Sequence, residues 1–379
     1  MKILHLDPDD IDNPMSGGGP RRTYEIYRRL ARRHEITVLT PTFCGSTERL
    51  IREGVQYVRL GRKVRNHASS HHITYFFALP LAVRSYTYDL LVEDLMPPAS
   101  ATLNPLFARG PVIASVQWFF ARMLSRQFHL PFHVFERYGV RLYRNFIVQT
   151  AAMEALIHSL APKARIACLP AGTDEALFSL PRQNGGDFVL YMGRVDFMQK
   201  GLDLLLRAYA LLGAEQRIPL IVAGHGDLSL AHSLVAELGL SHLVNFVGKV
   251  EGLERERLFR TCRFVAVPSR EETFGMVILE GCAAGKPVAL FDVTPMNEVA
   301  APGACEIAPP FDVQAYGEAL RRLLRATNDE LANRGDVCRD WARQFSWDAI
   351  ASAQSNFYEE CVSDWKNVHG RRNSGRQHR

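Results

Sequence analysis

Short apolar runs alternate with stretches of helical period along most of the chain. The runs have the length of β-strands. Several contain no alternating polar residues, which is typical of parallel strands buried on both faces. A repeated alternation of strand and helix favours a doubly wound layer, in which helices cover both faces of a parallel sheet. The pattern therefore predicts an α/β fold before any single residue is considered.

In the first half of the chain this pattern predicts a helix over about residues 21–33 and strands over residues 3–6, 35–40, 55–60, 89–92, 111–116 and 146–149. Residues 132–146 also have helical period, with Phe132, Phe135 and Phe146 on one face and Arg137 and Arg141 on the other. We interpret the aromatic face as part of the core. Contact with a membrane surface or a lipid-linked acceptor is the alternative interpretation.

A polar segment over residues 180–187 interrupts the pattern, which then starts again. The restarted pattern predicts a helix over residues 201–212 and strands over residues 188–192, 220–224, 245–248, 264–267 and 287–291. A length of 379 residues suits two domains of this class. We place the domains at residues 1–180 and 187–345, followed by a helix over 346–369 and a basic, disordered tail over 370–379.

Charge is divided unevenly along the chain. Residues 1–170 carry 22 Lys and Arg against 13 Asp and Glu, a net charge of +9, whereas residues 171–369 carry −8 and the tail +4. A basic first half attracts an anionic acceptor or membrane surface, although a solvated surface is the simpler interpretation. No apolar run approaches the roughly 18 residues of a membrane span. We therefore predict a cytoplasmic protein, with peripheral membrane contact as an alternative and no nucleic-acid partner.

Two separated stretches carry the candidate chemistry. In the first, residues 188–201, a predicted strand and a glycine turn are followed by Arg194 and Lys200. In the second, residues 268–280, a loop with Glu272 leads into a predicted helix that carries Glu280. Cations and free helix N–H groups suit a diphosphate, and carboxylates suit the hydroxyls of a sugar or ribose. Together the two stretches predict a site for a nucleotide sugar.

The two stretches together resemble the signature of the family 4 glycosyltransferases, which are retaining enzymes of the GT-B fold. The resemblance implies two Rossmann-like domains that face each other across a cleft: an N-terminal domain on the acceptor side and a C-terminal domain that binds the nucleotide sugar. It also implies that the C-terminal helix crosses back to the N-terminal domain.

The resemblance also implies roles for single residues. Arg194 and Lys200 are expected to neutralise the diphosphate as it leaves, and Glu272 to contact the donor sugar, so these three are the candidate catalytic residues. Glu280 is expected to bind the ribose hydroxyls. Further donor-binding residues are expected at the start of the same helix, namely Gly275, Met276 and Val277.

Two further donor contacts are implied in the first domain. Gly17 and Gly18 follow the first strand and match a glycine pair that meets the donor phosphate and sugar. Gln117 stands where many family members have a histidine that touches the donor sugar. Glutamine forms hydrogen bonds but carries no proton at neutral pH. Gln117 therefore either orients the sugar only or marks an altered activity.

No metal or other cofactor is expected. Arg194, Lys200 and the helix start already supply positive charge at the diphosphate. The Asp7-Pro8-Asp9 element resembles a metal motif of a different glycosyltransferase fold, but here we interpret it as a solvated or capping loop. The seven cysteines lack Cys-x-x-Cys spacing, so the sequence predicts reduced, buried thiols rather than zinc ligands or disulfides.

These observations predict a retaining glycosyltransferase of the hexosyltransferase type. It would move a sugar from a nucleoside diphosphate donor, UDP in the first instance, to a hydroxyl of a sugar, lipid-linked or natural-product acceptor. A nucleotide-sugar epimerase, a phosphorylase on the same fold and a donor-binding protein without turnover are the alternatives. A glycosidase is disfavoured because eight helical residues span roughly 12 Å, more than the separation of paired glycosidase carboxylates. A dinucleotide-dependent oxidoreductase is disfavoured because the first glycine loop lacks the required spacing.

Overall fold

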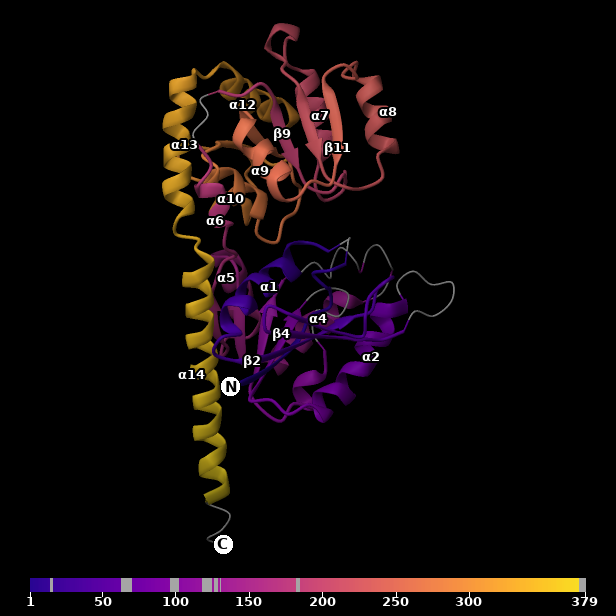
Figure 1. Ribbon diagram of the computed structural model, residues 1–379, viewed down its shortest axis with the longest axis vertical. Coiled ribbons are helices and arrows are strands. Elements are labelled where there is room, and N and C mark those ends of the chain that lie inside the picture. The colour runs from indigo at the N-terminus through magenta and orange to yellow at the C-terminus, as the bar shows by residue number, and fades with distance from the viewer. Residues whose placement is uncertain are drawn as a thin grey trace. The chain divides into compact units, whose positions relative to one another are not determined.

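The computed structural model of the protein describes residues 1–13, 16–62, 70–95, 102–117, 125, 129, 131–181 and 185–374. Within these residues the chain forms two compact units (Figure 1). Unit 1 comprises residues 1–171 and 347–379, and unit 2 comprises residues 172–346. Each unit is an α/β layer built on a predominantly parallel sheet, as the alternation of strand and helix predicts.

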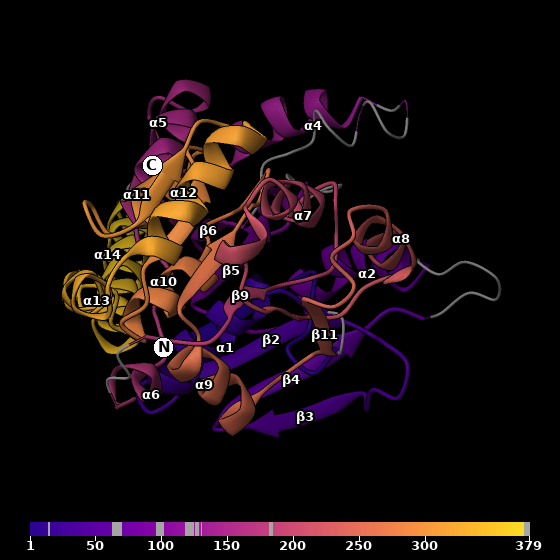
Figure 2. The ribbon, with the colours of Figure 1, turned by 90° about the horizontal axis from the view of Figure 1, so that it is seen from above.

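The described part of unit 1 holds an eight-stranded sheet in the order β3-β4-β2-β1-β5-β6-β7-β8. The strands are β1 (Lys2–Leu6), β2 (Glu35–Pro41), β3 (Arg49–Arg52), β4 (Val55–Leu60), β5 (Leu90–Leu95), β6 (Val112–Val116), β7 (Asn145–Val148) and β8 (Arg165–Cys168). Neighbouring strands run parallel except β3. This edge strand pairs antiparallel with β4, which in turn pairs parallel with β2 (Figure 2). Strand order reverses between β1 and β5, so their carboxyl ends flank the crevice where doubly wound sheets bind ligands.

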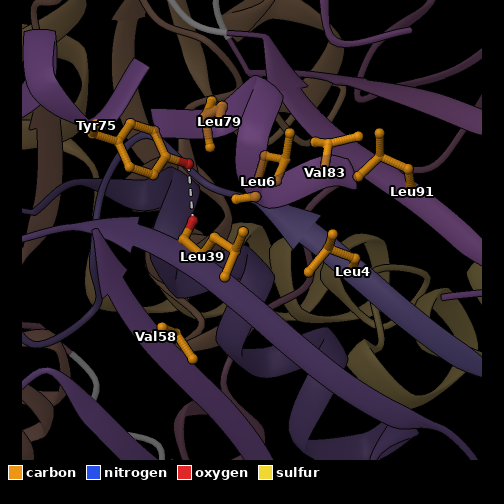
Figure 3. Packing of buried hydrophobic residues seen from close by; sticks show 9 residues of the cluster. Leu4, Leu6, Leu39, Val58, Tyr75, Leu79, Val83 and Leu91 are labelled. Carbon is orange, nitrogen blue, oxygen red and sulfur yellow. Dashed lines mark hydrogen bonds between the residues drawn. The ribbon is translucent and has the colours of Figure 1, made fainter. Parts of the chain in front are cut away.

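The core beneath this sheet is formed by aliphatic side chains from several parallel strands. Leu4, Leu39 and Leu91 pack against one face of α2 (Ser70–Ser85), which contributes Tyr75 and Leu79 (Figure 3). Tyr75 is fully buried, and its hydroxyl donates a hydrogen bond of 2.9 Å to the carbonyl of Leu39. The phenol thus adds apolar volume without leaving an unsatisfied polar group. All six residues of β5 are buried, which explains its uninterrupted apolar start.

The other helices of unit 1 are α1 (Gly18–Leu30), α4 (Phe132–Gly139), α5 (Ala151–Leu160) and α14 (Trp347–Ser374), with 3₁₀ turns at Asn104–Leu106 and Val140–Leu142. Helix α14, yellow in Figure 1, packs against α1 and so returns to the N-terminal unit as expected. Buried polar contacts hold α14 in place: the hydroxyls of Tyr27 on α1 and Tyr358 are 3.2 Å apart, and Nε2 of His34, which follows α1, lies 2.9 Å from Ser355 Oγ.

Arg22 is the central polar group of this junction. It is 3% exposed, and its Nη2 donates hydrogen bonds of 3.0 Å both to the Leu169 carbonyl and to Gln354 Oε1. One guanidinium therefore ties α1 to the segment after β8 and to α14. Because a buried charge is stable only with such partners, Arg22 makes the position of α14 part of the core of unit 1.

The prediction of one amphipathic helix over residues 132–146 is wrong. Helix α4 ends at Gly139, a 3₁₀ turn covers Val140–Leu142, and β7 begins at Asn145. Phe146 is fully buried in this parallel strand, where it packs near Tyr143. Aromatic residues lie on both sides of the boundary between α4 and β7. Their spacing in the sequence matches the period of one continuous helix, although no such helix exists. The interpretation of Phe146 as a core residue agrees with its burial.

The described part of unit 2 holds a six-stranded parallel sheet in the order β11-β10-β9-β12-β13-β14. The strands are β9 (Val189–Met192), β10 (Leu220–Ala223), β11 (Val244–Gly248), β12 (Phe264–Val267), β13 (Val288–Phe291) and β14 (Glu306–Ala308). The helices are α6 (Glu175–Phe178), α7 (Leu202–Ala210), α8 (Ser229–Glu237), α9 (Gly252–Thr261), α10 (Met276–Ala283), α11 (Met296–Val299), α12 (Val313–Arg325) and α13 (Asn328–Ala342), with a 3₁₀ turn at Ala214–Gln216. Here strand order reverses between β9 and β12.

No helix in the described ranges combines the length and apolar character that crossing a bilayer requires.

Replacing Arg22 with methionine should lower the free energy of unfolding by about 3 kcal/mol, because two buried acceptors lose a charged donor. Urea denaturation followed by circular dichroism measures this change. Arg32→Met, at an exposed position just beyond α1, is the matched control and should stay within about 0.5 kcal/mol of the parent. Equal stabilities of the two variants would contradict the role given to Arg22.

Candidate functional site

The two sequence motifs follow neighbouring strands of unit 2. The Arg194 stretch continues from β9, and the Glu272 stretch continues from β12. These strands pair in parallel, with Val189 opposite Phe264 and Leu190 opposite Val265. Their carboxyl ends therefore open at the same edge of the sheet, at the point where strand order reverses. This is where doubly wound sheets bind ligands.

Direct contacts join the two stretches beyond the strands. The carbonyl of Gln199 accepts hydrogen bonds from the backbone N–H groups of Arg270 (2.8 Å) and Glu271 (3.3 Å). The guanidinium of Arg270 forms two hydrogen bonds with the carboxylate of Asp203, of 2.7 and 2.8 Å. Gly201 has φ of 64°, and a Cβ there would lie 2.1 Å from the carbonyl of Pro268. Glycine is thus needed for the close approach of the two loops.

Lys200 and Glu272 meet in this joined loop pair. Lys200 Nζ lies 2.7 Å from Glu272 Oε1, and both side chains are largely buried. Ser269 Oγ donates a second hydrogen bond of 2.8 Å to the same carboxylate oxygen. Glu272, rather than the adjacent Glu271, is therefore the carboxylate held beside the lysine. The structure thus brings a predicted cation and a predicted sugar ligand into direct contact.

Arg194 occupies an exposed position at the end of β9. Its guanidinium donates a hydrogen bond to Gln199 Oε1, and the Tyr191 hydroxyl, 2.5 Å from the Arg194 carbonyl, holds the backbone. The neighbouring strand β10 ends in a Gly-His-Gly turn at residues 224–226 that approaches closely, since a Cβ on Gly224 would meet the Gly193 carbonyl at 1.7 Å. The cation therefore projects from a rigid, glycine-supported turn.

His225 lies beside Arg194 and was not identified from the sequence. Burial, together with the charges of Lys249 and Arg194, lowers the pKa of His225 below its ordinary value, so its ring is neutral at neutral pH. Its buried Nε2 has no hydrogen-bond partner among the described residues. The only signal in the sequence was a histidine between two glycines directly after a predicted strand.

Helix α10 begins where the sequence predicts. Gly275 is its N-cap with φ of 97°, and Met276 and Val277 form the first turn, whose N–H groups have no partner within the helix. Glu280 is buried further along the same helix, with its Oε1 2.6 Å from Arg255 Nη2. Burial disfavours the charged form of Arg255, but the carboxylate of Glu280 outweighs this effect and raises the arginine pKa. Arg255, on α9, is a second residue that sequence reasoning missed.

The remaining candidates lie in unit 1. Gly17 is the N-cap of α1, and Gly18 is its first residue. Gln117 follows β6, and all of its polar atoms are engaged: Nε2 donates to Asp94 Oδ2 (3.0 Å) and to Ser115 Oγ (3.3 Å), and Oε1 accepts from Gln149 Nε2 (3.1 Å). A Cβ on Gly19 would lie 3.5 Å from Gln117 Oε1, so the glycine loop runs past this amide.

A buried polar group surrounds Gln117 at the ends of β1 and β5. His5 Nε2 lies 3.1 Å from Asp94 Oδ1, His5 Nδ1 lies 2.5 Å from the Tyr27 hydroxyl, and Asp7 belongs to the same cluster. Burial, and then the charge of Asp94, raises the pKa of Asp7 well above its ordinary value of 3.8. Solvation was therefore a wrong expectation for Asp7 and also for Asp10, which is buried and ion-paired with Arg59 at 2.7 Å. The capping alternative agrees with the structure, since Asp7 Oδ1 and Asp10 Oδ1 accept hydrogen bonds from the backbone N–H groups of Asp9 (3.0 Å) and Asp12 (2.9 Å).

Two family profiles match the chain, one in each half. The profile described as Glycosyltransferase Family 4 matches residues 16–177, and the profile described as Glycosyl transferases group 1 matches residues 172–336. The chain belongs to glycosyltransferase family 4. The resemblance inferred from Arg194, Lys200, Glu272 and Glu280 is thereby confirmed at the level of the family.

Proteins named as glycosyltransferases are among the curated proteins similar to the chain. An uncharacterised glycosyltransferase of Methanocaldococcus jannaschii is 30% identical over 183 residues, 48% of this chain and 47% of that protein. The D-inositol 3-phosphate glycosyltransferase of Corynebacterium aurimucosum is 29% identical over 230 residues, 57% of this chain and 54% of that protein. The chain spans about half the length of the curated relatives it matches.

Several solved structures agree with the chain over nearly its whole length. Sucrose-phosphate synthase of Thermosynechococcus elongatus superposes with a TM-score of 0.79 at 19% identity, over 96% of this chain and 99% of that one. The Anabaena protein HepE, solved in complex with UDP and glucose, superposes with a TM-score of 0.74 at 18% identity, over 94% and 98%. This likeness establishes the GT-B fold for the family 4 chain.

Replacing Asp7 with asparagine should stabilise the free protein at neutral pH. The folded-state pKa of Asp7 lies above its unfolded value, so the folded chain loses stability as pH rises through that window. Asparagine resembles the protonated acid and avoids this loss, which is about 1.4 kcal/mol for each unit of pKa elevation. Urea denaturation at neutral pH and below pH 3.8 measures the difference, which should vanish in acid. A destabilised variant at neutral pH would contradict the assignment.

Proposed function

We propose that this chain is a retaining glycosyltransferase that moves a sugar from a nucleoside diphosphate sugar to an acceptor hydroxyl. UDP is the proposed nucleotide. The observation that carries the proposal is the meeting of the two motifs at the carboxyl ends of β9 and β12, where Lys200 contacts Glu272 at 2.7 Å. The complex of HepE with UDP and glucose supports the choice of donor.

The proposed chemistry follows from the charges at this edge of the sheet. The bond between the anomeric carbon and the β-phosphate oxygen breaks, and the acceptor oxygen forms a bond to the same carbon. Negative charge grows on the leaving diphosphate, which Arg194, Lys200 and the start of α10 stabilise. The proton of the acceptor hydroxyl passes to the leaving phosphate, so no protein base is required. Because Arg194, Lys200 and the start of α10 supply the positive charge, the proposal includes no bridging Mg²⁺ or Mn²⁺ at the diphosphate.

In this proposal the two carboxylates bind different parts of the donor. Glu280 lies beyond the first turn of α10, where it accepts hydrogen bonds from the ribose hydroxyls. Glu272 lies before the helix and beside Lys200, where it contacts hydroxyls of the transferred sugar. Its contact with Lys200 supports a proposed sugar subsite next to the proposed phosphate subsite. In the donor the sugar is bonded directly to the β-phosphate. A cation for the phosphate and a carboxylate for the sugar should therefore lie side by side, as Lys200 and Glu272 do.

A donor-binding protein without turnover is the second candidate, and one observation favours it. Gln117 replaces the proton-carrying histidine of many family members, and its amide is fully engaged by Asp94, Ser115 and Gln149. It is held in one orientation by three partners. An amide held in this way carries no proton at neutral pH, as expected of a protein that binds the donor without transferring its sugar. Measuring sugar transfer, as opposed to binding alone, separates the two candidates.

The donor is identified by thermal stabilisation against a panel of nucleoside diphosphates and their sugars. A ligand present at 100 times its dissociation constant adds about 2.7 kcal/mol of stability. UDP and a UDP-sugar should raise the melting temperature, and the other nucleotides should do so less. A panel without any stabilising nucleotide would refute the donor site. The acceptor, whether a sugar, a lipid-linked sugar or a natural product, is then identified with the best donor. The measured quantity is the sugar transferred to each acceptor, after subtraction of donor hydrolysis without acceptor.

Replacing Arg194 or Lys200 with alanine should lower turnover by about 10²-fold or more, because each stabilises charge that grows in the transition state. Steady-state kinetics with the preferred donor measures this effect. Arg207→Ala removes an exposed arginine of α7 in the same unit and is the matched control, with turnover near that of the parent. An Arg194 variant as active as the Arg207 variant would remove Arg194 from the catalytic residues.

The two carboxylates should respond differently to neutralisation. Glu280→Gln should weaken UDP and UDP-sugar equally, by roughly 1–2 kcal/mol, because both ligands carry the ribose. Glu272→Gln should weaken the UDP-sugar more than UDP. Titration calorimetry measures both ligands, and Glu271→Gln is the control, since that neighbour makes no ion pair with Lys200 in the described structure. Equal losses of both ligands in the Glu272 variant would contradict the division of roles.

A further inference from the structure

Three cysteines that are far apart in the sequence converge in unit 2. Cys282 lies in the last turn of α10, Cys305 immediately precedes β14, and Cys338 lies on α13. Their sulfur atoms all lie within 4.8 Å of one another, and Cys282 Sγ is 4.0 Å from Cys305 Sγ. Cys282 and Cys338 are fully buried, and Cys305 is partly exposed.

A close approach of backbones brings these thiols together. Helix α10 packs against α13 (Figure 2). A Cβ on Gly335 would lie 2.3 Å from the Gly285 carbonyl, so only glycine allows α13 to approach the turn after α10 so closely. Cys338 is three residues after Gly335, on the same helix face. Cys282 is three residues before Gly285. The glycine contact therefore places one cysteine of each helix against the other.

The separations of the sulfur atoms match those of ligands around one ion. Zinc–sulfur bonds of about 2.3 Å place two sulfur ligands about 3.8 Å apart in a tetrahedral site and about 4.0 Å apart in a trigonal one. A disulfide requires about 2.05 Å. The contact of 4.0 Å between Cys282 and Cys305 already has the ligand spacing. Closing the remaining separations from 4.8 Å requires movements of less than 1 Å, about the size of a side-chain adjustment.

Two features of the surroundings suit thiolate ligands and a bound cation. Arg334 supplies positive charge near Cys338, and its Nη1 contacts Ala304 and Glu306 on either side of Cys305. The carboxyl end of α10, where Cys282 lies, also favours a cation through its helix dipole.

We propose that Cys282, Cys305 and Cys338 bind one thiophilic metal ion, Zn²⁺ in the first instance, as three thiolate ligands. The three thiols release three protons on binding, and a water molecule completes the coordination. Soft thiolate ligands select Zn²⁺ or Cu⁺ over Mg²⁺ and Mn²⁺. The site is independent of the proposed sugar transfer. It would fix the end of α10, the helix that carries Glu280, against α13 and β14.

The test uses the full chain without an affinity tag that binds metal. The reduced protein is incubated with Zn²⁺, desalted, and assayed for zinc and for free thiols after denaturation. We expect one zinc per chain and seven free thiols. Cys305→Ser and Cys338→Ser should retain less than a tenth of the zinc. Cys262→Ser, at a buried cysteine of unit 2 outside the cluster, is the matched control and should retain all of it.

Spectroscopy of the unsubstituted chain guards against variants that fail to fold. Added Co²⁺ should produce a thiolate-to-metal charge-transfer band that saturates at one equivalent, and Zn²⁺ should abolish it. Absence of the band, or equal zinc retention in the Cys338 and Cys262 variants, would overturn the proposal. So would a disulfide between two of the three cluster cysteines, since their sulfur atoms could then not bind the ion as thiolates. None of these readouts depends on sugar transfer, so they remain informative if the proposed function fails.

Discussion

The parallel pairing of β9 with β12 is the constraint on which the candidate site depends. Each strand delivers one motif to the same edge of the sheet, although many residues separate them in the chain. The backbone of Gln199 then accepts hydrogen bonds from both residues that precede Glu272. Fixed positions of this kind matter in a transfer reaction, since donors that are already oriented need no reorganisation when charge develops.

Buried ion pairs hold the site together before any ligand binds. Lys200 is paired with Glu272, and Arg255 with Glu280, so each carboxylate proposed for the donor is already compensated by a cation. Without these partners a buried carboxylate would lose its charge or destabilise the fold. The pairs thus allow two negative groups to lie near the proposed diphosphate site. In the proposed complex, a ligand hydroxyl would add a hydrogen bond to each carboxylate without having to supply a counter-charge.

Local patterns predicted much of the fold and the linear part of the site. Apolar runs located β9 and β12, and the context of Gly275 located the start of α10, because these signals lie within a few neighbouring residues. Arg255, His225 and the three clustered cysteines could not be found this way, since their partners come from other elements. The prediction of one helix across Gly139 was wrong for a related reason. Hydrophobic period alone does not show that Phe146 belongs to a strand, because that strand is defined by its pairing with β6 and β8.

Helix α14 gives unit 1 an unusual relation to the order of synthesis. Arg22 near the start of the chain is buried against Gln354, which is translated only after all of unit 2. Domains generally fold as units while the ribosome is still at work, and usually from the N-terminal side. Here unit 2 is contiguous in the chain and can fold as soon as it is synthesised. Unit 1 lacks α14, and so leaves the surface that α14 covers unpacked, until the end of the chain is synthesised. That face therefore stays open to solvent for as long as unit 2 is being synthesised.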